Sequence, residues 1–239
     1  MAQTTTPYPA STVVLARPDE NGGFEIFMNR RPEKMDTYAG IYVFPGGRVE
    51  ESDWSAGMLQ LIRGLTAAEA RQILSSEQQP ERCLGHWVAA VRELFEEAGI
   101  QMFEPRSGAR KESVHETNYE RLAEKRASLQ QGEIDFPGLL ESEGLVCDIS
   151  RLSYFFHRVT PDHYPVRFDT RFYLTALPAR QSPLHVSEEV SESLWVTPQE
   201  ALDRHAAGGF PMMPPTLAVL RTLVTHGTWM RLRAAFRLE

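Results

Sequence analysis

The sequence predicts an α/β fold in which a mixed sheet is covered by helices on both faces. Short apolar, β-branched segments come first, a long amphipathic helix follows, and further strands and helices complete the chain. That order of elements is typical of a layered α/β architecture. The chain has 239 residues, a length that suits one domain, residues 1–239, with a sizeable insertion.

The N-terminal part predicts three strands. Residues Ser11–Arg17 and Phe24–Arg30 are short, apolar and β-branched. The turn-forming stretch Pro-Asp-Glu-Asn-Gly-Gly between them favours a hairpin or an adjacent pair. Residues Ile41–Phe44 predict a third strand, which ends at the following Pro-Gly-Gly.

The middle of the chain predicts helices. Residues 54–80 show helical spacing of apolar side chains and end in a polar run. The clearest helix covers Arg82–Gly99, because apolar side chains recur there at steps of three and four along one face: Trp87, Val91, Leu94, Phe95 and Ala98. Gly99 stands where a helix C-cap glycine belongs.

The C-terminal half alternates between helices and strands. Thr197-Pro198 is a helix start, with an N-cap threonine followed by proline at the first helical position. Helices are predicted over residues 111–132, 136–143, 199–206, 217–224 and 229–236, and strands over 153–159, 167–177 and 194–196.

The composition is ordinary for a soluble globular chain, with 42% hydrophobic and 24% charged residues. The formal net charge of −7 argues against broad electrostatic binding of nucleic acid. No apolar run is long enough to cross a membrane, and the N-terminus lacks the features of a secretory signal. Cys83 and Cys147 favour two buried, reduced thiols. We therefore expect a cytoplasmic protein that acts on a small molecule, not on nucleic acid or a membrane, as a monomer or a homodimer.

Three carboxylates, Glu93, Glu96 and Glu97, share one face of the clearest helix, since at about 100° per residue they fall within a sector about 100° wide. A solvated acidic face is one interpretation. However, Glu93 and Glu97 form a like-charge i,i+4 pair that costs ~0.2–0.5 kcal/mol, and they lie near the helix C-terminus, where the dipole disfavours anions. A cation bound to this face explains the cluster better, and oxygen ligands suit Mg²⁺ or Mn²⁺.

These residues carry a resemblance to a known family. Residues 92–100, Arg-Glu-Leu-Phe-Glu-Glu-Ala-Gly-Ile, resemble the second half of the Nudix box, R-E-U-x-E-E-x-G-U with U aliphatic, at every fixed position. Residues 44–47, Phe-Pro-Gly-Gly, resemble its first half, and Asp53 stands where the box has its first Glu. The box expects the Arg fourteen residues after Gly47. Here 92 − 47 = 45, so about 31 residues, within the helical stretch at about 54–84, are inserted.

Membership of the Nudix hydrolase family implies an α/β/α sandwich, here with a helical insertion in the box and extra C-terminal helices. It also implies metal-dependent hydrolysis of a diphosphate bond in a nucleoside-diphosphate-linked small molecule. The resemblance assigns Glu93, Glu96 and Glu97 as ligands of Mg²⁺ or Mn²⁺, with Glu93 also a candidate base and Arg92 orienting Glu93. A bound Mg²⁺ would neutralise the diphosphate and lower the pKa of bound water.

The interrupted box resembles the coenzyme A diphosphatase subgroup, the Nudix hydrolase nineteen type. Residues 157–161, 167–178 and 210–216 are similar to that subgroup as well. Its coenzyme A signature matches in part: Arg31 and Gly40 fit, whereas Pro32 and Asp36 replace a Ser and an Arg. Coenzyme A or an acyl-coenzyme A is therefore the expected substrate. ADP-ribose or an ADP-sugar is the alternative, and a non-catalytic nucleotide-binding module is the alternative of another class.

Several further residues are candidates for the site. Glu189 is the choice for an additional metal carboxylate, although a plain acidic loop explains it equally well. Arg31 and Arg167 are candidates for binding substrate, with a surface arginine and a structural ion pair as the respective alternatives. Gly46 and Gly47 are expected to approach the diphosphate. The insertion and residues 210–216 are expected to shape the pocket beyond it, with Phe210, Met212 and Met213 either lining that pocket or packing the C-terminal helices.

Overall fold

The computed structural model describes residues 5–34, 38–106, 119–184 and 190–238. At its centre is a seven-stranded sheet, whose main path runs in the order β10-β2-β1-β9-β8. The bounds of these strands are β1 Tyr8–Pro18, β2 Phe24–Arg30, β8 Ser153–Val159, β9 Phe168–Ala176 and β10 Glu192–Val196. Two short strands, β3 (Tyr42–Val43) and β4 (Gly46–Arg48), pair with β2 and β1. Because β1 and β9 are parallel and the other pairs are antiparallel, the sheet is mixed, as predicted.

Strand β1 lies in the middle of the sheet because its side chains are apolar on both faces. Residues 13–16, Val-Val-Leu-Ala, are fully buried. The predicted hairpin with β2 is confirmed, with Ala16 opposite Ile26. Its turn is closed by the Asp19 side chain, which accepts hydrogen bonds from the backbone N–H groups of Asn21 and Gly23. Gly22 has a φ of 82°, a conformation that glycine adopts without a steric penalty.

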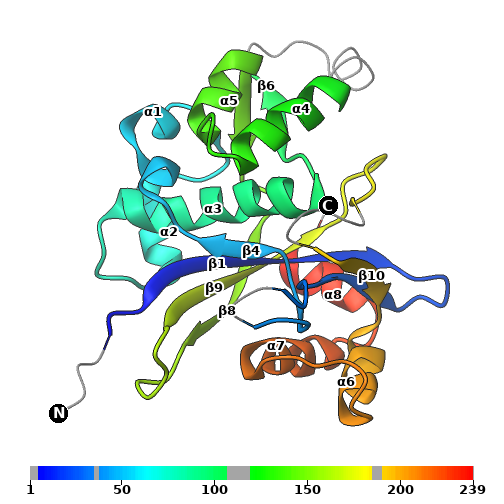
Figure 1. Ribbon diagram of the computed structural model, residues 1–239. Helices are drawn as coiled ribbons and strands as arrows, with labels where there is room; N and C mark the ends of the chain where they lie inside the picture. Colours follow the sequence, from blue (N-terminus) through cyan, green and yellow to red (C-terminus); the bar gives the residue numbers. More distant parts are fainter. Residues whose placement is uncertain (1–4, 35–37, 107–118, 185–189, 239) are drawn as a thin grey trace.

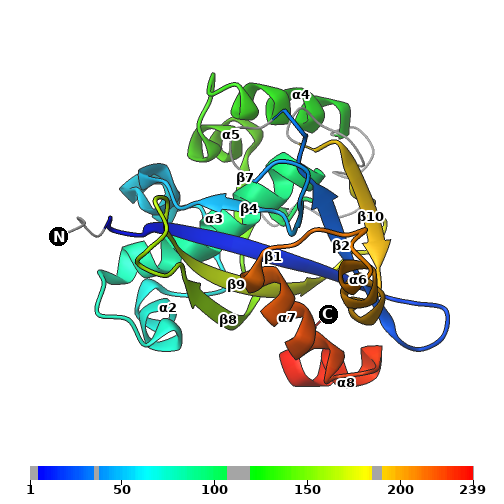
Figure 2. The ribbon, with the colours of Figure 1, turned by 60° about the horizontal axis from the view of Figure 1, so that its bottom comes forward.

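Helices cover both faces of this sheet (Figures 1 and 2). One face carries α3 (Pro80–Ala98), and α1 (Ala56–Leu59), α2 (Ala67–Leu74), α4 (Tyr119–Gln130) and α5 (Phe136–Glu143) lie on the same side. The other face carries α6 (Pro198–Ala206), α7 (Pro214–Val224) and α8 (Trp229–Phe236). Alternation along β2 feeds two cores: Phe27 packs on the α3 side, while Ile26 and Met28 pack on the side of the C-terminal helices. The predicted α/β/α sandwich is confirmed.

A second, three-stranded sheet was not predicted. It has the order β5-β7-β6, with β5 Ile62–Arg63, β6 Phe103–Pro105 and β7 Leu145–Asp148. The insertion is therefore not purely helical: a 3₁₀ turn, Glu51–Trp54, and α1 precede β5, and α2 follows it. The two-residue β5 pairs in parallel with β7, Ile62 opposite Cys147. A strand this short has no periodicity of its own, and its partner lies far along the chain.

Other predicted elements agree closely with the structure. The bounds of α5, β8 and α8 are those predicted, and Thr197 caps α6 by accepting the backbone N–H of Glu200. The predicted helix at 111–132 begins outside the described residues, which contain α4 from Tyr119 onward. Cys83 and Cys147 are free and buried, as expected. Within the described ranges, no helix is both long and apolar enough to span a bilayer.

Candidate functional site

The last two turns of α3 carry the predicted site residues. The helix starts at Pro80, which needs no hydrogen-bond donor there, and ends at Gly99 in the left-handed conformation with a φ of 68°. The Gly99 backbone N–H donates to the carbonyl of Phe95 at 2.9 Å. The apolar face of α3 packs on the sheet across β1, and residues of β4 lie beside it. The carboxylate face is thereby held next to Gly46 and Gly47 of β4.

Arg92 is the centre of a buried network of charges. Its Nε and Nη2 donate to the two carboxylate oxygens of Asp53 at 2.9 and 3.0 Å. Its Nη1 donates to Glu93 Oε1 at 2.8 Å and to Glu96 Oε1 at 3.4 Å, and its Nη2 also donates to the carbonyl of Arg48 at 2.8 Å. Burial lowers the pKa of Arg92, but the bonds to Asp53 and the charges of Glu93 and Glu96 outweigh it and raise that pKa.

The role of Asp53, open at the level of sequence, is clear from this geometry. Asp53 is fully buried, and its Oδ2 accepts the backbone N–H of Glu50 at 2.8 Å in addition to the Arg92 bond. Both oxygens of this carboxylate are therefore used inside the protein. Asp53 anchors Arg92, and Arg92 in turn orients Glu93 and Glu96.

Two glycines allow the close approach of β4 to α3 and β1. A Cβ atom on Gly47 would lie 2.3 Å from Glu93 Oε1, and one on Gly46 would lie 2.5 Å from the carbonyl oxygen of Ser11. The Ser11 contact is with backbone, so Gly46 cannot be replaced without moving the strand.

Burial raises the pKa of Glu93 to about 7, although the neighbouring Arg92 opposes the shift.

Glu97 has a separate anchor that sequence reasoning missed. Asn29 on β2 is buried, and its Nδ2 donates to Glu97 Oε2 at 3.4 Å. Ser193 on β10 donates to Asn29 Oδ1 at 2.8 Å, which fixes the amide with its donor side toward Glu97. Two residues after Phe27 on the same strand, Asn29 points to the face that α3 covers. In the sequence, the only hint of this role is a single amide side chain, Asn29, on the buried face of an otherwise apolar strand.

The donor set fits a hard divalent cation. Glu93, Glu96 and Glu97 offer carboxylate oxygens, and the charges of Asp53, Glu93 and Glu96 share the single guanidinium of Arg92. Over the described ranges, no three His, Cys, Asp or Glu side chains converge on a ready-made metal site. Arg92 holds Glu93 and Glu96 in fixed positions from one side. The carboxylates still carry more negative charge than Arg92 neutralises, and a bound cation would offset the excess.

A cavity of about 470 Å³ opens beside Gly46 and Gly47 of β4. The residues that line it are Ala10, Thr12, Arg31, Tyr38, Ile41, Val43, Phe44, Gly46, Gly47, Arg48, Val166, Phe168, Thr170, Phe172, Met213, Pro215 and Thr216. Among the residues that the structure describes, this lining contains two arginines and no carboxylate. Arg48 lies over the ring of Tyr8, 4.0 Å from the centroid. The buried Nε of Arg31 has no hydrogen-bond partner among the described residues.

The structure brings most, not all, of the predicted substrate residues together. Arg31, Gly46 and Gly47 line the cavity. Arg167 is not part of that lining; its Nε donates to the carbonyl of Thr160 at 3.0 Å, and it also pairs with Asp162. Glu189 lies outside the described residues.

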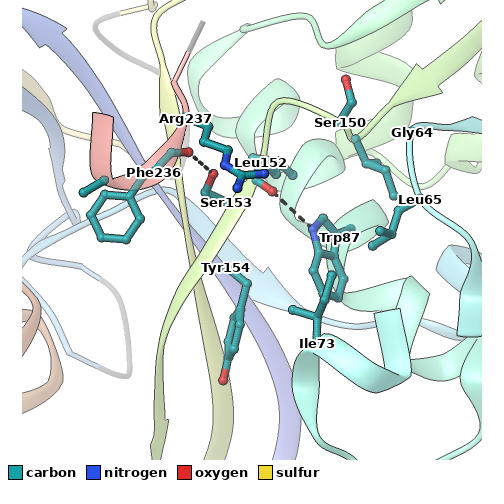
Figure 3. Close-up of a pocket in the computed structure, with 12 residues that line it drawn as sticks. Gly64, Leu65, Ile73, Trp87, Ser150, Leu152, Ser153, Tyr154, Phe236 and Arg237 are labelled. Atoms are coloured by element: carbon teal, nitrogen blue, oxygen red, sulfur yellow. Dashed lines mark hydrogen bonds between the residues drawn. The ribbon is translucent and has the colours of Figure 1, made fainter. Parts of the chain in front are cut away.

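The expected pocket walls are only partly found. Met213 lines the cavity, whereas Phe210 is fully buried and stacks on Tyr42 with ring centroids 3.6 Å apart. Met212 is also buried in the core of the C-terminal helices. None of the described lining residues comes from the insertion. The insertion instead helps to line a separate cavity of about 360 Å³, with Leu65, Trp87 and Arg237 among its walls (Figure 3).

A pair of glycines set against a helix of carboxylates, inside an α/β/α sandwich, defines the Nudix class. Residues 3–223 match the NUDT19 Nudix domain, and the chain belongs to this family. The crystal structure of a NUDIX hydrolase from Alicyclobacillus acidocaldarius is similar, with a TM-score of 0.72 and 28% identity over 95% of each chain.

Curated relatives resemble the same region. The chain is 30% identical over 226 residues to acyl-coenzyme A diphosphatase NUDT19 of Gallus gallus, and the match covers 80% of this chain and 59% of that protein. It is 24% identical over 226 residues to acyl-coenzyme A diphosphatase NUDT19 of Xenopus laevis, and that match covers 84% of this chain and 60% of that protein. The chain thus spans about three fifths of the length of these relatives.

Proposed function

We propose that the protein is a divalent-metal-dependent diphosphatase that hydrolyses coenzyme A or an acyl-coenzyme A. The observation that carries this proposal is the junction of the carboxylate face of α3 with the arginine-containing cavity across Gly46 and Gly47. Chemistry on a diphosphate can take place at the carboxylates while the remainder of the substrate occupies the cavity. The names of the NUDT19 relatives support the choice of substrate.

Glu93, Glu96 and Glu97 are the residues that would hold Mg²⁺ or Mn²⁺. When bound, the metal neutralises the diphosphate and makes water more acidic. Glu93, which faces Gly47 at the edge of the cavity, accepts a proton from the attacking water. The water oxygen forms a bond to one phosphorus while the bond from that phosphorus to the bridging oxygen breaks. The bridging oxygen leaves with the other phosphorus, so the two products are phosphate monoesters. Arg92 holds Glu93 in place through this step.

The lining of the cavity favours coenzyme A over ADP-ribose or an ADP-sugar. Coenzyme A carries a third phosphate and a long, partly apolar pantetheine arm. Arg31 and Arg48 can pair with a phosphate, and Phe168, Phe172 and Met213 offer apolar surface to the remainder. An ADP-sugar has neither the extra phosphate nor an apolar arm, so it would leave both features of the cavity unused.

A substrate panel read by mass spectrometry tests the proposal. Coenzyme A with Mg²⁺ or Mn²⁺ should yield 3′,5′-ADP and phosphopantetheine, and dephospho-coenzyme A and ADP-ribose should turn over more slowly. Arg31→Gln should reduce the preference for coenzyme A over dephospho-coenzyme A. Arg158→Gln, at an exposed arginine outside the lining, serves as the control. A preference for ADP-ribose would reject coenzyme A but keep the diphosphatase chemistry. Binding without hydrolysis would instead favour the non-catalytic module.

A cytoplasmic location and a homodimeric state stay predictions. Size-exclusion chromatography with light scattering would decide between the monomer and the homodimer.

A further inference from the structure

The last turn of α3 is held by a helix that lies outside the Nudix box. The last carbonyl groups of a helix have no partner within it. Two of them in α3 are satisfied by neighbouring backbone: that of Phe95 by Gly99, and that of Ala98 by the N–H of Leu184 at 2.9 Å. The carbonyl of Glu96 is satisfied by two side chains of α4. Arg126 Nη1 donates to it at 2.6 Å, and Gln130 Nε2 donates to it at 2.8 Å.

This double contact falls on a residue of the candidate metal site. Glu96 presents its carboxylate to the site and its backbone carbonyl to α4, so Arg126 and Gln130 act on the same residue as Arg92, from the opposite end. The buried Nε of Arg126 has no partner among the described residues. Arg126 is half-buried, and only part of its hydrogen-bonding capacity is used. Burying an unpaired donor costs free energy, which the contact with Glu96 must offset.

The charge of Arg126 is also placed where the helix needs a cation. The C-terminus of α3 is the negative pole of the helix dipole, and three carboxylates crowd its last two turns. Arg92 neutralises part of this charge from the side, and Arg126 does so at the helix end. Without Arg126 and Gln130, the carbonyl of Glu96 would lose both of these donors, and the last turn would be held less firmly.

We propose that Arg126 and Gln130 are positioning residues for divalent metal binding. They fix the last turn of α3, so that the carboxylates of Glu96 and Glu97 keep the orientation that the metal requires. This inference rests on the proposed function, because that proposal makes Glu96 and Glu97 ligands. Neither residue needs to touch the substrate, the metal or the reacting atoms.

Two effects of removing Arg126 oppose each other. Loss of a cation near the site should strengthen metal binding, whereas loss of the fixed turn should weaken it. The Gln130→Met substitution separates them, because it removes one donor to the Glu96 carbonyl and changes no charge. The Arg126→Lys substitution keeps a charged donor. Lys125→Met removes a positive charge from the adjacent position, where the described structure records no bond to α3.

The test is the affinity for Mn²⁺, measured by electron paramagnetic resonance without substrate. Arg126→Met should bind Mn²⁺ about 10-fold more weakly than the wild type, the lower end of the range seen when a metal ligand loses a hydrogen-bond partner. Gln130→Met should also bind more weakly, while Arg126→Lys and Lys125→Met should stay close to the wild type. In turnover assays, Arg126→Met should require more metal for half-maximal rate and regain most of kcat at saturating metal.

Several outcomes overturn the inference. Wild-type or tighter Mn²⁺ affinity in both Arg126→Met and Gln130→Met would show that the turn needs no support from α4. An equal loss in Lys125→Met would show that the weaker binding does not come from the contacts with the Glu96 carbonyl. Circular dichroism of each variant checks the fold, and a misfolded Arg126→Met leaves Gln130→Met to decide. Because Mn²⁺ affinity is measured without turnover, a wild type that binds Mn²⁺ but hydrolyses no coenzyme A would reject the proposed function alone.

Discussion

Arg92 and Asp53 form a buried two-point ion pair, with Nε–Oδ1 and Nη2–Oδ2 distances of 2.9 and 3.0 Å. The pair joins the two halves of the interrupted Nudix box, because Asp53 lies before the insertion and Arg92 after it. The side-chain exposures of 4% and 0% leave neither partner access to water. The inserted residues therefore extend the chain between the two halves without separating them.

Loss of this ion pair should destabilise the fold. Asp53→Asn keeps the shape of the side chain but leaves the buried charge of Arg92 short of a counter-charge. We expect the free energy of unfolding in urea to fall by about 3 kcal/mol. Glu25→Gln, at the more exposed Arg17–Glu25 pair, should change it by less than ~1 kcal/mol. Equal effects of the two substitutions would argue against a special role for the Asp53–Arg92 pair.

Glu97→Gln should abolish most of the activity and leave the fold intact. The substitution keeps the shape of the side chain but removes a charged oxygen ligand, so we expect kcat at saturating Mg²⁺ to fall at least ~10²-fold. Without metal, the melting temperature should stay level or rise slightly, because the repulsion between Glu93 and Glu97 is relieved. A rate near that of the wild type would mean that Glu97 is not a metal ligand.

Gly47→Ala should displace the carboxylate of Glu93. The added Cβ would lie 2.3 to 2.7 Å from the carboxyl atoms of Glu93, which must then move away from their place beside Arg92. A shift of this size can cost about 10²-fold in kcat. Gly57→Ala is the matched control, since a Cβ there meets nothing within 4 Å. Steady-state rates of the two variants decide, and an active Gly47→Ala enzyme would show that Glu93 tolerates displacement.

His86 should make the protein less stable in mild acid. His86 lies on α3 and is buried against β1, where its Nδ1 is 3.1 Å from Ser11 Oγ. Burial, together with the charge of Arg171, lowers the pKa of His86 to about 3. Below pH ~6.5 the unfolded chain gains a proton at this residue and the folded protein does not. The contribution of His86 to the free energy of unfolding is therefore complete above pH ~6.5. It decreases by about 1.4 kcal/mol per pH unit as the pH falls from there toward 3.

Unfolding experiments at pH 7 and pH 5 measure this effect. Between these values, the wild type should lose about 2 kcal/mol more stability than His86→Asn. His163→Gln, at an exposed histidine, should behave like the wild type. Equal losses in the wild type and His86→Asn would mean that His86 takes up its proton normally in the folded state.

The sequence was informative where signals are local. The spacing of Trp87, Leu94 and Phe95 locates α3, and the glutamates of that helix could be assigned because helical geometry alone places them on one face. The two-residue β5 could not be found, since only its pairing with β7 makes it a strand. Arg48 and Arg126 were missed for a related reason. Nothing near either residue in the sequence shows that one stacks on Tyr8 and that the other reaches the carbonyl of Glu96.

The parallel pairing of β1 with β9 has a consequence for biosynthesis. Thr12 pairs with Phe172, so β1 leaves the ribosome at least 172 − 12 = 160 residues before its neighbour. During that interval β1 has only β2 and β4 to pair with, and the edge that later pairs with β9 stays open along the apolar run Val13–Ala16. Open apolar edges of nascent chains favour aggregation. We therefore expect fragments that stop before residue 168 to require chaperones or to aggregate, however well α3 and the carboxylates are formed.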